Sequence, residues 1–254
     1  MTIGVPPGFI PSIREEKTSA EGRFFSLTFN WNGEPIPGVF LLPHRQESPV
    51  PAALLLHGFS LKKEYMASTV GAELLSGGIA SLAIDLPLHG ERYTARFVPP
   101  NSPFELMDRW RTAQQECSIA LQFLAGHPEI DERRLSLAGY SLGAFLGLKV
   151  ASDEVRVRSV ILAAGGDLPN YIPFLAMVRM VADPIQWVRR LKRPLLMLHG
   201  RQDTIITPDL AQRLFDAARE PKKLLWYDSG HILPREALTG AAHWLTVQCS
   251  ITQT

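Results

Sequence analysis

Cysteine and long apolar runs are scarce in this sequence. The two cysteines, Cys117 and Cys249, form no CxxC pair and no metal-type cluster, and free thiols are typical of a reducing compartment. No run of about 18 apolar residues occurs, which argues against a membrane-spanning helix. Met1–Lys17 carries three prolines and no apolar stretch after a basic start, so it does not resemble a signal peptide. We therefore expect a cytoplasmic protein without a membrane partner.

Charge of one sign is also lacking. The 26 basic and 25 acidic residues leave a formal net charge of +1, which gives no electrostatic reason to expect nucleic acid as a partner. The 254 residues suit one domain with a single large core, and the 46% of hydrophobic residues is ordinary for a globular chain. We expect neither a metal nor a cofactor, and the oligomeric state stays open.

Strand-like segments recur along the whole chain. An Asn32-Gly33 step between the first two predicts an N-terminal β-hairpin. Six short, continuously apolar runs follow, separated by helix-length segments, which predicts an α/β fold with a mostly parallel central sheet and helices on both faces. The predicted strands are 24–31, 36–42, 52–56, 80–84, 135–138, 159–163, 195–198 and 223–227.

Two longer segments depart from this alternation. Arg92–Asp108 contains three prolines and is expected to be an irregular loop before a helix at Arg109–Ala125. The segment at 167–193 is rich in large apolar residues, and we interpret it as a small helical cap inserted into the single domain 1–254. An ordinary amphipathic crossover helix is the alternative.

Gly139-Tyr140-Ser141-Leu142-Gly143 matches the G-x-S-x-G pattern of a nucleophilic serine. The setting makes this short pattern specific, because an apolar strand leads into it and a helical run follows. A serine at such a sharp turn is held in a strained conformation, with its hydroxyl near a helix N-terminus that favours negative charge. Side chains at Gly139 and Gly143 would collide across the turn. Ser141 is therefore the predicted nucleophile.

A serine nucleophile needs a base, and the base needs an acid that orients it. His231 follows the last predicted strand and comes after Ser141, as the chain order of such triads requires; His89 precedes Ser141 and breaks that order. We expect His57 and His199 to hold loop backbone. The other histidines are expected to be surface or packing residues: His44, His127 and His243.

Asp203 is the predicted acid because it follows the strand at 195–198, which places it at the same sheet edge as Ser141 and His231. Asp167, after the preceding strand, is the alternative. Asp228 lies too close to His231 in the sequence to reach around to its ring, and we expect it to cap the turn.

The tetrahedral intermediate of acyl transfer needs two N–H donors. The residue after the nucleophile, Leu142, supplies one. The second is expected from the loop after the strand at 52–56, where His57-Gly58-Phe59 makes the N–H of Phe59 the candidate. Both donors are backbone groups, so the Phe59 side chain should affect substrate fit more than catalysis.

From about Phe24 to Leu245 the sequence resembles the α/β-hydrolase superfamily. The short His57-Gly58-Phe59 loop is similar to that of the dienelactone-hydrolase-like and feruloyl-esterase-like groups, and 131–135 is similar to prolyl-oligopeptidase-type catalytic domains. Ser141 replaces the cysteine of dienelactone hydrolases, and no propeller domain precedes the elbow. The resemblance implies a carboxylic ester hydrolase with a Ser, His, Asp triad and no cofactor.

The sequence thus predicts hydrolysis of small or medium acyl or aryl esters through Ser141, His231 and Asp203. A peptidase or an acyltransferase could use the same triad, so these alternatives stay open. A binding protein without catalysis on this fold is a further alternative, since fold does not dictate function.

Overall fold

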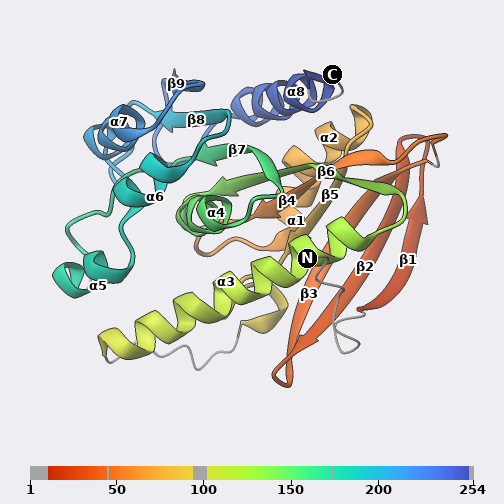
Figure 1. Ribbon diagram of the computed structural model, residues 1–254, viewed down its shortest axis with the longest axis horizontal. Coiled ribbons are helices and arrows are strands. Elements are labelled where there is room, and N and C mark those ends of the chain that lie inside the picture. Colours follow the sequence, from red (N-terminus) through yellow and green to blue (C-terminus); the bar gives the residue numbers. More distant parts are fainter. Residues whose placement is uncertain (1–10, 45, 94–101, 173, 252–254) are drawn as a thin grey trace.

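The computed structural model describes residues 11–44, 46–93, 102–172 and 174–251. In these ranges nine strands form one sheet, with helices packed on both of its faces (Figure 1). The strands are β1 Ser12–Thr18, β2 Gly22–Trp31, β3 Glu34–Pro43, β4 Val50–Leu56, β5 Ala80–Ile84, β6 Ile130–Tyr140, β7 Val157–Ala163, β8 Leu195–Gly200 and β9 Lys222–Tyr227. The helices are α1 Lys63–Met66, η1 Ala67–Gly71, α2 Ala72–Ser76, η2 Gly90–Arg92, α3 Pro103–Gly126, α4 Leu142–Asp153, α5 Leu175–Val181, α6 Pro184–Arg190, α7 Pro208–Ala217 and α8 Arg235–Ile251.

The N-terminal strands form the antiparallel side of the sheet. Strands β2 and β3 pair from Trp31 opposite Glu34 onwards, and the two turn residues between them, Asn32 and Gly33, both have positive φ. The predicted hairpin is therefore confirmed. Strand β1, which pairs with β2, was not expected from the sequence because its residues are all exposed and mostly polar. Charged side chains on an edge strand hinder pairing with another chain.

The remaining strands form the parallel side, in the order β5-β4-β6-β7-β8-β9. Every predicted core strand falls within an observed one, and the predicted mostly parallel sheet is confirmed. Because the strands are parallel, the loops that follow β4, β6, β8 and β9 all leave from the same edge of the sheet. This edge carries the candidate site.

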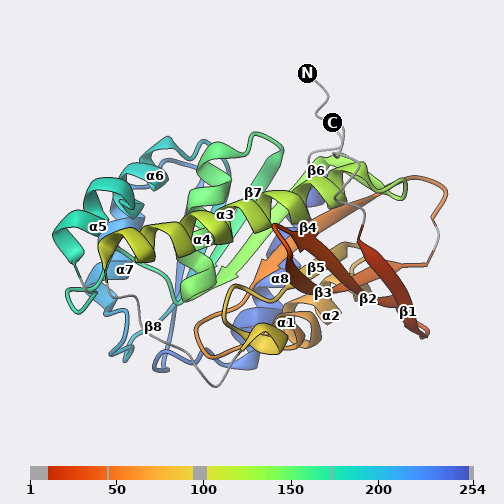
Figure 2. The ribbon, with the colours of Figure 1, turned by 90° about the horizontal axis from the view of Figure 1, so that it is seen from below.

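Helices cover both faces of the sheet, as predicted (Figure 2). Helices α3, α4, α6 and α7 pack side by side on one face, while α1, η1, α2 and α8 pack on the other. Successive residues of a strand point to opposite faces. On β4, Leu54 and Leu56 belong to the first core and Leu55 to the second. A strand buried on both sides has to be continuously apolar, which is the pattern seen in the sequence.

Helix α3 begins earlier than predicted, so the expected irregular loop at Arg92–Asp108 is wrong from Pro103 onwards; residues 94–101 of it lie outside the described residues. Ser102 is the N-cap and its hydroxyl accepts a hydrogen bond from the N–H of Glu105. Pro103 takes the first helical position, where its missing N–H has no cost. A proline that starts a helix was mistaken for one that prevents it.

Two short helices, α5 and α6, occupy the segment 167–193 between β7 and β8. Helix α6 packs between α4 and α7, as a crossover helix of the sheet does, whereas α5 extends away from the sheet toward the start of α3 (Figures 1 and 2). The segment thus combines the two interpretations that the sequence allowed.

Candidate active site

The turn between β6 and α4 places Ser141 at the carboxyl edge of the sheet. Ser141 has φ 50° and ψ −111°, an uncommon conformation for a residue with a side chain, and it is the N-cap of α4. A Cβ at Gly139 would lie 2.1 Å from the carbonyl oxygen of Gly143, and one at Gly143 would lie 2.2 Å from that of Leu56. The turn is therefore possible only with glycine at both flanks.

The structure brings Ser141, His231 and Asp203 together. The Ser141 hydroxyl lies 2.9 Å from Nε2 of His231, and Nδ1 of His231 lies 2.7 Å from Oδ2 of Asp203. Since Asp203 is an acceptor when ionised, Nδ1–H donates to it, which leaves Nε2 free to accept the proton of the serine hydroxyl. These three residues form a continuous hydrogen-bonded chain from three different loops.

The carboxylate of Asp203 is buried but well supplied with donors. Its Oδ1 accepts hydrogen bonds from the N–H groups of Ile205 at 2.8 Å and Ile206 at 3.0 Å. Burial raises the pKa of Asp203, but the hydrogen bonds from His231 and from these two N–H groups outweigh it, and the pKa lies below its usual value. Asp203 is thus ionised at neutral pH and fixes the orientation of the His231 ring.

Tyr140 was not singled out in the sequence, although it lies inside the elbow. Its hydroxyl donates to the carbonyl oxygen of His231 at 2.7 Å and accepts from the N–H of Leu233 at 2.9 Å. Burial raises the pKa of Tyr140 to about 12, so the hydroxyl keeps its proton. Tyr140 therefore connects the turn that carries Ser141 to the loop that carries His231.

The loop after β4 lies against Ser141. A Cβ at Gly58 would lie 3.3 Å from Cβ of Ser141, which shows how closely this loop approaches. In the described part of the chain, neither the N–H of Phe59 nor that of Leu142 donates to a protein acceptor. An oxyanion formed at Ser141 would need two N–H donors without protein acceptors, and these two groups belong to the residue after Ser141 and to the loop that approaches it.

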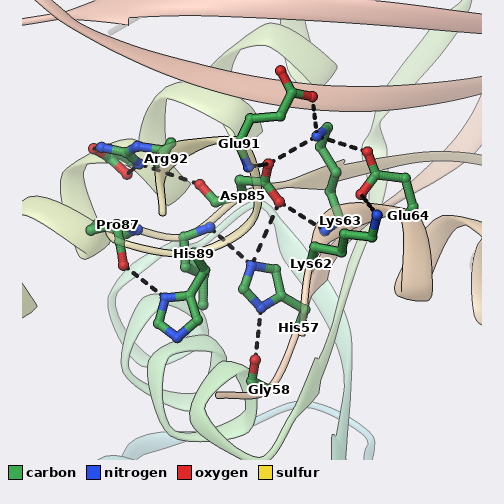
Figure 3. Close-up of polar contacts among 12 residues, drawn as sticks. His57, Gly58, Lys62, Lys63, Glu64, Asp85, Pro87, His89, Glu91 and Arg92 are labelled. Atoms are coloured by element: carbon green, nitrogen blue, oxygen red, sulfur yellow. Dashed lines mark hydrogen bonds and ion pairs between the residues drawn. The ribbon is translucent and has the colours of Figure 1, made fainter. Parts of the chain in front are cut away.

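Buried charges hold this loop in place (Figure 3). The N–H and Nζ of Lys63 donate to the two oxygens of Asp85 at 2.9 and 2.8 Å, and Nζ also contacts Glu64 and Glu91. Burial lowers the pKa of Lys63, but the three carboxylates outweigh it and the pKa lies above its usual value. The end of the loop is therefore tied to the residues that follow β5.

His57 holds the start of the same loop. Its Nε2 accepts the N–H of Leu86 at 3.0 Å and its Nδ1–H donates to the carbonyl oxygen of Gly58 at 2.8 Å. His199 likewise donates from Nε2 to the carbonyl oxygen of Ile206 at 2.8 Å. The expectation that both histidines hold loop backbone is confirmed.

The other residues considered as acid or base lie outside the hydrogen-bonded chain of Ser141, His231 and Asp203. Asp167 is buried and binds the guanidinium groups of Arg179 at 2.8 Å and Arg213 at 3.2 Å, rather than a histidine. His89 donates from Nδ1 to the carbonyl oxygen of Pro87 at 2.8 Å, and its ring contacts the rings of His57 and Phe59. Asp228 was expected to cap its turn; its side chain is instead exposed and lies 3.5 Å from Arg201.

A largely apolar cavity of about 600 Å³ is lined at one place by Phe59 and by Leu142, the residue after Ser141. The other lining residues come from α3, from α4 and from the segment 167–193. The cavity offers space for an apolar group of a molecule bound near this turn.

The described residues contain no group of three or more histidine, cysteine or acidic side chains placed to hold a metal ion. Among these residues, no helix has both the length and the apolarity needed to cross a membrane.

The chain belongs to the alpha/beta hydrolase family, whose model matches residues 53–251. It is 30% identical over 114 residues to the polyketide transferase ATR5 of Stachybotrys chlorohalonatus, a match that covers 45% of this chain and 36% of that protein. Esterase YjfP of Escherichia coli is 24% identical over 199 residues, which cover 69% of this chain and 78% of the esterase.

An uncharacterized protein of Mycobacterium tuberculosis is 24% identical over 73% of this chain and 64% of its own length. The chain thus spans about a third of the polyketide transferase and slightly less than two thirds of the mycobacterial protein.

Solved structures show the same fold over nearly the whole chain. The acetyl xylan esterase from Paenibacillus sp. R4 matches with a TM-score of 0.77 at 18% identity, covering 95% of this chain and 89% of the other. A cold-adapted esterase from an Arctic intertidal metagenomic library matches with a TM-score of 0.74 at 22% identity, covering 92% and 97%. The α/β-hydrolase fold predicted from the sequence is confirmed.

Proposed function

We propose that this protein is a serine esterase that hydrolyses carboxylic esters with small or medium acyl or aryl groups. The hydrogen-bonded chain from Ser141 through His231 to Asp203 carries this proposal. Membership of the hydrolase family supports it, as do the esterases among the similar proteins.

In the proposed reaction, Oγ of Ser141 attacks the ester carbonyl carbon and its proton passes to Nε2 of His231. Asp203 stabilises the imidazolium that forms, and the N–H groups of Phe59 and Leu142 stabilise the oxyanion. The C–O bond to the alcohol then breaks, and the alcohol leaves with the proton from His231. Water repeats the sequence on the acyl-enzyme, which releases the acid and restores Ser141.

The segment 167–193 acts as a small cap on the single domain in this proposal, because Leu168, Val178 and Trp187 from it line the cavity beside the nucleophile. The substrate is a small molecule. The two buried thiols, Cys117 and Cys249, suit a reducing compartment, so we propose the cytoplasm as the location.

Hydrolysis of p-nitrophenyl esters from acetate to decanoate tests the proposal. Ser141→Ala should lower kcat by about a million-fold, the cost typical of removing such a nucleophile. Ser250→Ala, at an exposed serine of α8, is the matched control and should keep wild-type activity. A Ser141→Ala variant that retained most of the activity would contradict the assignment. Failure of a fluorophosphonate to label Ser141 would favour a binding protein.

Acyl transfer is the second candidate, favoured by the similarity to a polyketide transferase. The acyl-enzyme would then react with an alcohol or amine instead of water. Adding such acceptors to the ester assay separates the two functions: a transferase forms the transfer product in excess of free acid, whereas an esterase forms mainly the acid.

A further inference from the structure

A pocket of about 380 Å³ lies at the edge of the sheet where the parallel strands begin, opposite to the edge that carries Ser141. Residues of β6, of β7, of the end of α8 and of the segment just before β8 line it. Ser136 in this lining lies five residues before Ser141, which corresponds to about 16 Å along β6. The pocket also shares no lining residue with the cavity that Phe59 and Leu142 line. We call it the basic pocket.

Cationic side chains gather around the basic pocket. Arg134, Arg158, Lys192 and Arg193 all line it, whereas no carboxylate of the described residues does. The whole chain has a formal net charge of only +1, so this excess of positive charge is local and is not a property of the entire surface.

Three of these four cations have no acidic partner. Arg134 pairs with Asp131 at 2.9 Å. Arg158, Lys192 and Arg193, in contrast, form no ion pair with any side chain in the described ranges. Cations that share a pocket without a counter-charge repel one another, and a bound anion would remove that repulsion.

Arg193 shows this repulsion most directly. Burial and the charge of Arg158 hold the pKa of Arg193 below its usual value, and Glu154, which pairs with Arg156, offsets only part of the effect. Nη1 of Arg193 donates to the carbonyl oxygen of Ala151 at 2.6 Å. Its Nε and Nη2 have no acceptor in the part of the chain that the structure describes, and they are not shielded from solvent. Both groups are therefore available to a ligand.

The number and type of these cations favour a phosphate-bearing ligand. Three unpaired positive charges call for an anion with more than one negative charge, and a phosphate group carries about −1.5 to −2 at neutral pH. The planar guanidinium groups of Arg158 and Arg193 can each donate two parallel hydrogen bonds to phosphate oxygens. The volume of the pocket lies within the range of small-ligand sites, above about 300 Å³.

We propose that the basic pocket binds a small molecule that carries a diphosphate group, with Arg158, Lys192 and Arg193 as its counter-charges. The proposal goes beyond the proposed esterase function and does not depend on it, because none of these residues belongs to the hydrogen-bonded chain of Ser141, His231 and Asp203.

Calorimetric titration with inorganic pyrophosphate at low salt tests the proposal. The wild-type protein should bind pyrophosphate with a Kd of about 1 mM or below. Arg158→Gln and Lys192→Gln should each weaken this binding about tenfold, since each removes a charged hydrogen-bond donor. Both side chains are exposed, so thermal unfolding without ligand should stay as in wild type. No detectable binding of pyrophosphate to the wild-type protein overturns the proposal.

Two control variants separate a site from general attraction. Lys223→Gln removes the same charge from an exposed lysine of β9, outside the basic pocket, and should bind pyrophosphate as wild type does. Lys192→Arg keeps the charge and should also keep the binding. If Lys223→Gln weakens binding as much as Lys192→Gln does, the attraction is not local and the proposal is wrong.

Citrate tests the class of ligand, because it matches pyrophosphate in charge but offers carboxylates in place of phosphates. We expect citrate to bind about tenfold more weakly, and equal binding of the two anions would overturn the assignment to phosphate. In the ester assay pyrophosphate should not compete with substrate; competitive inhibition would place it at Ser141 and contradict the proposal. If the protein hydrolyses no ester, the esterase function fails while the calorimetric result still decides this inference.

Discussion

At the scale of single residues, Tyr140 links the turn that carries Ser141 to the loop that carries His231. Tyr140→Phe removes the hydroxyl that donates to the carbonyl oxygen of His231 and accepts from the N–H of Leu233. Because both backbone groups lose a buried partner, we expect the free energy of unfolding to fall by about 1–3 kcal/mol. The His231 loop should also lose its fixed position, so kcat should fall more than KM changes. Urea unfolding and ester kinetics measure the two effects.

Tyr65→Phe is the control for this prediction. The ring of Tyr65 packs 6.1 Å from that of Tyr140, but its hydroxyl makes no hydrogen bond within the described ranges. This variant should keep both stability and kcat. Equal kcat in Tyr140→Phe and in wild type would show that the loop is held without the tyrosine.

The residues of the site differ in how far the sequence alone could reveal them. Ser141, Asp203 and His231 each follow an apolar run, and a parallel sheet brings such positions to one edge. Tyr140 gave no such signal, because its partners lie 91 and 93 residues away and the contact depends on how two loops meet in space.

At the scale of elements, the β6–α4 turn depends on the absence of side chains. Gly143→Ala places a Cβ 2.2 Å from the carbonyl oxygen of Leu56, so the helix would have to move away from β4. We expect a loss of about 3 kcal/mol or more in the free energy of unfolding, together with a loss of ester hydrolysis. Chemical denaturation and kinetics check both.

Gly240→Ala is the opposite case in α8. Gly240 is exposed and a Cβ there would meet nothing within 4 Å, so alanine should stabilise the protein by about 0.5–1 kcal/mol through its higher helix propensity. If the two substitutions had similar effects, the close approach of α4 to β4 would not be what requires Gly143.

The loop after β4 should make stability depend on pH through His57. Burial lowers the pKa of His57 from 6.5 to about 4, so between these values the unfolded chain binds a proton that the folded protein does not. The free energy of unfolding should therefore fall as the pH falls through this window, by about 3 kcal/mol from this group. Urea unfolding between about pH 7 and pH 4 measures the slope.

His57→Asn removes the titrating ring. The variant should be less stable than wild type near neutral pH, because the N–H of Leu86 loses its acceptor. The stability difference between the two proteins should shrink by about 3 kcal/mol on acidification. A difference that stays constant with pH would assign the acid sensitivity to other groups.

Elements with a local sequence signal were predicted well, and those without one were not. The Asn32-Gly33 turn fixed the hairpin because positive φ is needed at both positions. The start of α3 was missed because Pro103 suits both a loop and the first turn of a helix. The hydrogen bond from the N–H of Glu105 to the hydroxyl of Ser102 distinguishes a helix start from a loop. This bond forms only when the helix forms, so the sequence alone does not reveal it.

At the scale of the whole molecule, sequence periodicity was enough to predict the sheet and its two helical layers, because a strand buried on both faces leaves a continuous apolar run. The arrangement of the 167–193 segment could not be predicted in this way. Helix α6 packs on α4 while α5 extends away, and Arg179 of α5 pairs with Asp167, whose carboxylate also binds Arg213 of the distant helix α7.

Asp167 ties α5 to the body of the protein. Its buried carboxylate binds Arg179 of α5 and Arg213 of α7, and its own N–H donates to the carbonyl oxygen of Leu210. Asp167→Asn removes the charge that holds both guanidinium groups, which should loosen α5 over the cavity. We expect kcat/KM for octanoate esters to fall about five- to tenfold, chiefly through KM, a loss of about 1–1.4 kcal/mol. Acetate esters, which do not reach α5, should be hydrolysed nearly as before.

Asp209→Asn distinguishes this tether from general electrostatics. Asp209 is an exposed partner of the same Arg213, at 3.7 Å, and an exposed pair of this kind contributes little. The variant should therefore hydrolyse octanoate and acetate esters at wild-type rates. Equal losses on both esters in Asp167→Asn would mean that the ion pair supports the active-site loops rather than α5, because only a contact along the far part of the cavity can depend on the length of the acyl chain.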